Sequence, residues 1–103
     1  MTLDRQVNFG RLASLAGRHC ESILRRWLPD GERRGAEWVA TNPTRIDRHK
    51  GSFKVNVMTG RWSDFATGDR GGDLIGLAAY LFRLTQKEAA LKIAEMLGID
   101  PYE

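Results

Sequence analysis

The residues able to bind a metal ion or act as nucleophiles are few in this chain of 103 residues. The complete set of Cys and His residues is His19, Cys20 and His49. A structural zinc site needs about four such ligands in two clusters, and neighbouring helical residues such as His19 and Cys20 point in different directions. Cys20 also lies on an apolar stripe, which favours a core position over a nucleophile. We therefore expect no metal, no cofactor and no disulfide, and a single cysteine agrees with a cytoplasmic location.

The acidic residues and glycines offer two further kinds of site. Asp64, Asp69 and Asp73 have spacings that could hold a magnesium ion, although turn formation and helix capping are their more ordinary roles. Gly71-Gly72 before a helix start could receive a phosphate, but no Lys-Ser/Thr follows as in a Walker loop. Since Ser and His form no nucleophile elbow or triad signature, we expect no catalytic residues and no enzyme.

The net charge of +3 is unevenly distributed along the chain. Residues 1–72 contain 13 Lys and Arg against 8 Asp and Glu, a net charge of +5. Residues 73–103 contain 3 against 5, a net charge of −2. Such asymmetry suits an acidic partner such as nucleic acid, and it also occurs in proteins that bind none.

The first element that would position these side chains is a helix over residues 8–28. Its apolar residues recur at steps of three and four and form one stripe. Asn8 can cap its start, and Pro29 ends it. Arg11, Arg18 and Arg25, spaced by seven, form the opposite face, either as a solvated surface or as a stripe that follows phosphates.

Residues 37–65 predict a small antiparallel sheet of about three strands. Residues 37–41 form the first strand, and a basic loop over 44–51 follows. Apolar residues then alternate from position 53 to 57, as in a half-buried strand. Thr59-Gly60 forms a hairpin turn into a partner strand over residues 61–65.

Residues 73–97 predict a helical hairpin. Asp73 caps its first helix, Thr85 and Glu88 form a capping box for the second, and Gly98 is suited to a left-handed stop. The sequence therefore predicts one α+β domain over residues 1–103, in which a sheet packs with an N-terminal helix and two C-terminal helices. No apolar run is long enough to cross a bilayer, so we expect no membrane.

Three motifs in this domain resemble the zinc-ribbon domain of bacterial and phage DNA primases. They are Asn42-Pro43-Thr44-Arg45, Gly51-Ser52-Phe53-Lys54-Val55 and Gly71-Gly72-Asp73-Leu74-Ile75. The family reads roughly C-P-x-H, then P-S-F-x-V and a hairpin, then C-x-x-C-x-x-G-G-D and two hydrophobic residues that open a helix. The resemblance covers about residues 37–97.

The resemblance implies a degenerate, metal-free ribbon. It places the four zinc ligands at Asn42, Arg45, Phe65 and Gly68, none of which is Cys or His. We expect four aromatic residues to supply apolar area where the metal was, and the helix over 8–28 to cover one side of the sheet. These aromatic residues are Trp38, Phe53, Trp62 and Phe65.

In primases of this family the ribbon contacts single-stranded template DNA while another domain makes the bonds. The resemblance implies a non-catalytic DNA-binding module in the replication of a phage or mobile element, acting with single-stranded DNA and with a primase-helicase or other replication protein. The predicted nucleic-acid-binding residues lie on the hairpin and its flanking loops. They are Arg45, Arg48, Lys50, Lys54, Arg61, Trp62 and Arg70. Arg33 and Arg34 widen this patch, and Trp62 is either a stacking platform or a core residue.

The alternative is a protein–protein interaction module that docks on a replication or defence protein and binds no nucleic acid. Salt-sensitive binding to a single-stranded oligonucleotide would favour the first function. Tight, salt-tolerant binding to a protein would favour the second. Neither function involves a small-molecule substrate.

Overall fold

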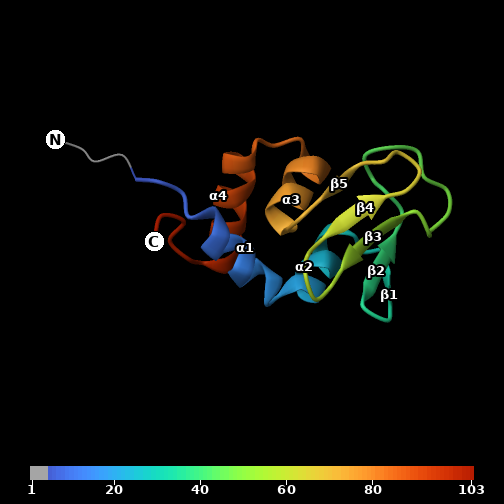
Figure 1. Cartoon of the computed structure of the whole chain (residues 1–103), viewed down its shortest axis with the longest axis horizontal. Helices are drawn as coiled ribbons and strands as arrows, with labels where there is room; N and C mark the ends of the chain where they lie inside the picture. Colours follow the sequence, from blue (N-terminus) through green and yellow to red (C-terminus); the bar gives the residue numbers. More distant parts are fainter. Residues whose placement is uncertain (1–4) are drawn as a thin grey trace.

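The computed structural model describes residues 5–103, in which four helices and a five-stranded antiparallel sheet form an α+β fold (Figure 1). The helices are α1 (Phe9–Gly17), α2 (Cys20–Trp27), α3 (Leu74–Phe82) and α4 (Gln86–Leu97). The strands are β1 (Glu32–Arg34), β2 (Glu37–Ala40), β3 (Phe53–Asn56), β4 (Trp62–Asp64) and β5 (Arg70–Gly71), in that order across the sheet. The predicted α+β class is confirmed, whereas the predicted count of about three strands is wrong.

The two strands missed by the prediction are the edges of the sheet. All three side chains of β1 are exposed, and β5 is two residues long. Both strands pair through backbone hydrogen bonds, β1 with β2 and β5 with β4. Short, charged edge strands have no alternation of apolar side chains, which is the pattern that identifies a strand in a sequence.

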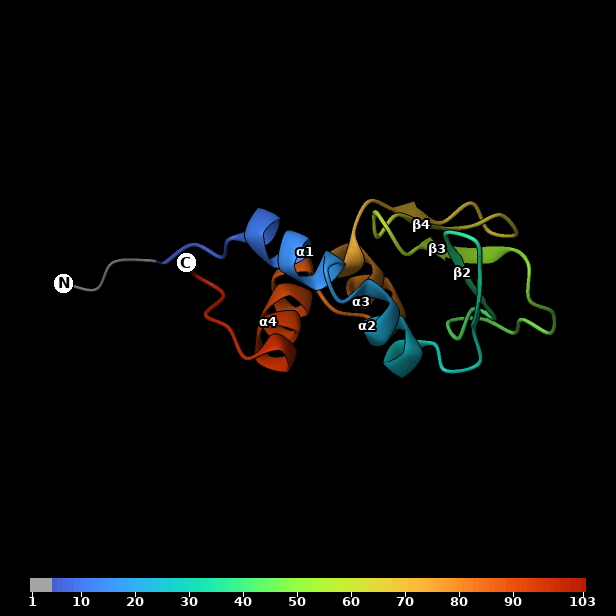
Figure 2. The same cartoon turned by 90° about the horizontal axis from the view of Figure 1, so that it is seen from below.

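The single helix predicted over residues 8–28 is two helices, because the chain turns tightly at Arg18 and His19. Asn8 caps α1 as predicted, since its side-chain oxygen accepts a hydrogen bond from the Arg11 N–H. After Gly17 the Arg18 N–H donates to the carbonyl of Leu15, three residues back, at 3.2 Å. The turn redirects the chain, so α1 packs on α3 and α4, whereas α2 lies beside the sheet, where the Cys20 thiol contacts the Asn56 carbonyl (Figure 2).

Trp38 joins α2 to the sheet. Its indole N–H donates to the Leu28 carbonyl at 3.1 Å, and the Arg25 guanidinium lies 5.2 Å from the centroid of its ring. A Cβ at Gly31 would lie 2.1 Å from the indole nitrogen, so the ring packs directly on the backbone there. Because Arg11 lies in α1, Arg18 at its end and Arg25 in α2, the three arginines do not form one stripe along a single helix.

Both C-terminal helices begin, and α4 ends, as the sequence predicts. Asp73 accepts a hydrogen bond from the Gly76 N–H at the start of α3. Thr85 and Glu88 form both bonds of a capping box at the start of α4, and Gly98 ends α4 with a left-handed φ of 69°. Within residues 5–103 no helix has the length and apolar character needed to span a membrane.

Candidate nucleic-acid interface

The two faces of the sheet differ in what covers them. Phe53, Val55 and Trp62 lie on the face packed against the helices and are buried in the core. The side chains on the other face of β3, β4 and β5 are polar, and the register places Lys54 beside Ser63 and Ser63 beside Arg70. Lys54 and Arg70 therefore lie in one row across three strands, with their Cα atoms about 10 Å apart.

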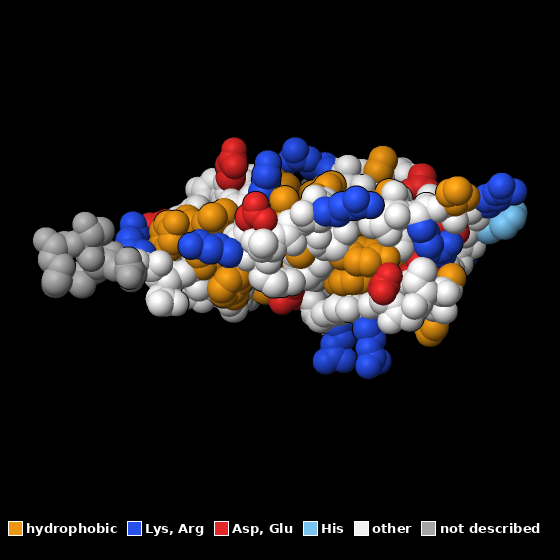
Figure 3. Space-filling model, turned by 90° about the horizontal axis from the view of Figure 1, so that it is seen from above, with side chains coloured by type: hydrophobic (Ala, Val, Ile, Leu, Met, Phe, Trp, Pro, Cys, Tyr) orange, Lys and Arg blue, Asp and Glu red, His pale blue; other side chains and the backbone are white. Residues whose placement is uncertain are grey.

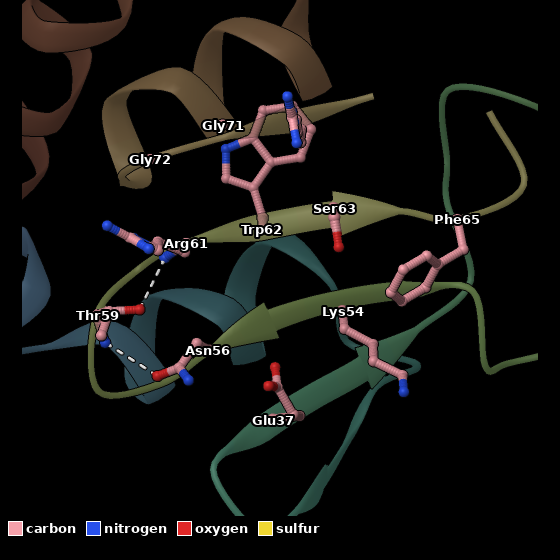
Figure 4. Close-up of a pocket in the computed structure, with 11 residues that line it drawn as sticks. Glu37, Lys54, Asn56, Thr59, Arg61, Trp62, Ser63, Phe65, Gly71 and Gly72 are labelled. Atoms are coloured by element: carbon pink, nitrogen blue, oxygen red, sulfur yellow. Dashed lines mark hydrogen bonds between the residues drawn. The ribbon is translucent and has the colours of Figure 1, made fainter. Parts of the chain in front are cut away.

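A hollow of about 870 Å³ lies along this polar row, and we call it the sheet groove (Figure 4). Its lining includes three cations, Lys54, Arg61 and Arg70, against one acidic residue, Glu37. Its remaining lining is largely of small polar residues and glycines. Basic side chains also project from the half of the molecule that contains the sheet, and at the far end of this half they lie beside a histidine (Figure 3). The groove is therefore suited to a polyanion.

Phe65 lies at one end of the sheet groove and is 77% exposed. The Lys54 ammonium lies 6.0 Å from the centroid of its ring, and the two side chains lie side by side in Figure 4. The expectation that Phe65 fills the core is wrong. Phe65 follows the buried Asp64, so strand alternation directs it to the face that no helix covers.

Trp62 contacts the sheet groove only at its edge. Its side chain is 6% exposed, and its ring lies 4.7 Å from that of Tyr80, centroid to centroid. A Cβ at Gly71 would lie 2.5 Å from the Trp62 indole nitrogen, so the indole packs on the glycine backbone. Trp62 is therefore a core residue that only borders the groove, and little of its ring is exposed for stacking on a base.

Arg45 is paired with an acidic residue rather than free in the loop. Its guanidinium donates to the two carboxylate oxygens of Asp64 at 2.9 and 3.3 Å, and it lies 3.4 Å from Asp47. The Asn42 amide donates to the same Asp64 carboxylate at 2.8 Å. Two of the positions that the resemblance gives to zinc ligands thus meet at one carboxylate.

The carboxylate of Asp64 is fully buried and remains ionised. Burial alone would raise its pKa, but hydrogen bonds from Arg45, Asn42 and the Ala66 N–H outweigh that effect and hold the pKa of Asp64 well below its ordinary value. The same hydrogen bond to Asp64 raises the pKa of Arg45. Both partners therefore stay charged throughout the neutral range.

Tyr80 connects this pair to α3. Its hydroxyl accepts a hydrogen bond from the Asn42 amide and donates one to Asp69, both at 2.8 Å. We call Asn42, Arg45, Asp64, Asp69 and Tyr80 the polar cluster. It links the loop after β2, the end of β4, the loop before β5 and α3, and none of its residues lines the sheet groove.

The other predicted basic residues lie outside the groove lining. Arg48 and Lys50 are exposed in the loop before β3. Neither lines the sheet groove. Of the predicted binding residues, the sheet groove thus brings together Lys54, Arg61, Arg70 and the edge of Trp62. It adds Phe65 and Glu37, for which the sequence offered only strand alternation as a signal.

Within residues 5–103, no group of three His, Cys, Asp or Glu side chains is placed to hold a metal ion. The three aspartates considered for magnesium have separate roles. Asp64 binds Arg45, Asp69 accepts from Tyr80, and Asp73 caps α3. Burial, and then the charge of Glu21, raise the pKa of the Cys20 thiol to about 11, so Cys20 is a protonated core residue at neutral pH.

Comparisons with known proteins do not assign the chain to a family. No protein-family model, curated protein or solved structure matches it. Its function is therefore argued from the sheet groove and the polar cluster.

Proposed function

We propose that the chain is a non-catalytic module that binds single-stranded nucleic acid in the sheet groove. The observation that carries this proposal is the exposed Phe65 ring beside the Lys54 ammonium, on a concave surface that also contains Arg61 and Arg70. Cationic side chains attract the phosphate backbone, and an exposed aromatic ring stacks on an unpaired base. Stacking on a base requires an exposed base face, which favours single strands over duplexes.

The polar cluster supports a metal-free relationship to primase zinc ribbons. Asn42 and Arg45 converge on Asp64, and the Gly68 N–H donates to the Asp64 carbonyl at 2.8 Å. Hydrogen bonds therefore tie together the two loops that a zinc ion would join. On this proposal the module acts in the cytoplasm, on single-stranded DNA during replication of a phage or mobile element, beside a primase-helicase or similar protein.

The test is chemical-shift mapping of the isotope-labelled protein with a short oligodeoxythymidine. We expect the largest shifts at Lys54, Phe65 and Arg70, and small shifts on α1 and α4. Duplex DNA of the same length should bind more weakly. Shifts confined to the helices, or none at low salt, would show that the groove is not the binding surface.

The protein-docking alternative has its own signature in this experiment. If the chain only docks on a protein, the oligonucleotide leaves the spectrum unchanged at low salt. Binding to a protein partner should then persist at high salt, since apolar contacts are weakly screened.

A further inference from the structure

A second hollow of about 690 Å³ lies among the helices and shares no residue with the sheet groove. Its floor is apolar and consists of Trp27 of α2, Phe82 at the end of α3, Leu84, and Met96 of α4. Phe82 is 49% exposed although it is large and apolar. We call this hollow the helix notch.

The two aromatic rings give the helix notch its shape. Trp27 and Phe82 meet edge to face, with centroids 5.6 Å apart and planes at 84°. Perpendicular rings do not form a flat platform on which a base could stack. Together with the flexible side chain of Met96, they line a hollow that suits a bulky aliphatic or aromatic side chain.

The rim of the helix notch is charged. Arg26 and Lys92 lie on it together with one acidic residue, Glu95. Among residues 5–103, neither of the two cations makes a salt bridge or a side-chain hydrogen bond. A ligand with carboxylates beside its apolar anchor would neutralise both cations, whereas a neutral apolar ligand would leave them unpaired.

We infer that the helix notch binds an acidic peptide segment of another protein, in which a large apolar side chain lies next to one or more carboxylates. The apolar side chain fills the hollow lined by Trp27, Phe82 and Met96, and the carboxylates pair with Arg26 and Lys92. This site is independent of nucleic-acid binding, so the module can contact a strand and a protein at the same time.

The experiment uses a fluorescein-labelled peptide of sequence Gly-Gly-Asp-Asp-Leu-Phe titrated with the whole chain at low and moderate salt. Two comparison peptides replace both Asp by Lys, or both Leu and Phe by Ala. We expect saturable binding of the first peptide, at least tenfold weaker binding of each comparison peptide, and weaker binding in higher salt. Equal binding of the Asp and Lys peptides, or no binding of any, would overturn the proposal.

Two variants assign the binding to the helix notch. Phe82→Ala should lower the affinity for the first peptide at least tenfold, and the double variant Arg26→Glu/Lys92→Glu should lower it by a similar factor. Both altered cations are exposed, so the double variant keeps the test valid if Phe82→Ala unfolds the protein. Lys87→Glu, on the same helix as Lys92 but outside the notch, should bind like the parent.

Two further outcomes are decisive. Dimerisation that is abolished by Phe82→Ala, without peptide binding, would assign the notch to a second copy of this chain and overturn the peptide proposal. Phe82→Ala should also leave oligonucleotide binding unchanged. If the parent protein binds the peptide but no oligonucleotide, the proposed function is refuted and the peptide proposal stands.

Discussion

The guanidinium of Arg45 donates two hydrogen bonds to the carboxylate of Asp64, at 2.9 and 3.3 Å, across 19 residues of sequence. Asp64 is fully buried, whereas Arg45 keeps about a quarter of its side chain exposed. Breaking a buried pair leaves an uncompensated polar group, so the loss of one partner costs more than the pair contributes. The polar cluster is therefore sensitive to the loss of any one charged partner.

Asp64→Asn should lower the free energy of unfolding by about 2–3 kcal/mol, because Arg45 loses its charged partner and the amide cannot accept from all three donors. Urea denaturation measures the change. Glu32→Gln, which removes the partner of an exposed pair with Arg34, should leave the midpoint nearly unchanged. Equal midpoints for the two variants would contradict a structural role for the polar cluster.

Acid should destabilise the parent protein more than Asp64→Asn. The pKa of Asp64 is lowered in the folded state, so its contribution is complete above its ordinary pKa of 3.8 and is lost as the pH falls below it. The urea midpoint of the parent should therefore fall further between about pH 5 and pH 2. If the urea midpoints of the parent and of Asp64→Asn change with pH in parallel, Asp64 has the same pKa in the folded and the unfolded protein, which would contradict this prediction.

Gly71→Ala should lower the free energy of unfolding by about 1–3 kcal/mol, because the new methyl group collides with a ring that cannot move away from the core. Its Cβ would lie 2.5 Å from the indole nitrogen of Trp62. The adjacent Gly72→Ala is the matched control, since a Cβ there meets nothing within 4 Å. Thermal unfolding of the two variants distinguishes these positions, and equal melting temperatures would contradict the packing of Trp62 on Gly71.

Local signals in the sequence predicted the starts of α1, α3 and α4. Asn8, Asp73 and the Thr85–Glu88 pair cap backbone groups within four residues of themselves, so their neighbours identify them. The break at Arg18 was not predicted, because the apolar stripe continues across it from Ala16 to Cys20.

Non-local pairing explains what the sequence could not predict at the site. From the sequence alone, Arg45 is expected to be an unpaired cation in a basic loop, since its partner Asp64 comes 19 residues later. The exposure of Phe65 depends on which face of the sheet the helices cover. By contrast, strand alternation placed Lys54 on the polar face, where the structure has it.

Phe65→Ala should weaken binding of a short oligodeoxythymidine about tenfold, because base–aromatic stacking contributes about 1–3 kcal/mol per base. The free energy of unfolding of this variant should change little, since the Phe65 side chain is 77% exposed. Met58→Ala removes another exposed apolar side chain, 74% exposed and outside the groove lining, and should bind like the parent. Equal affinities for both variants would exclude Phe65 as the stacking residue.

The most direct test of the sheet groove is the salt dependence of oligonucleotide binding, measured by fluorescence anisotropy. Each phosphate contact with a single strand contributes about −0.7 to the slope of log K against log salt. The triple variant Lys54→Ala/Arg61→Ala/Arg70→Ala should therefore lose about 2 from the steepness of the slope, together with most of its affinity. The variant Arg18→Ala/Lys87→Ala/Lys92→Ala has the same net charge and should keep the parent slope. Equal slopes for the two triple variants would contradict binding in the sheet groove.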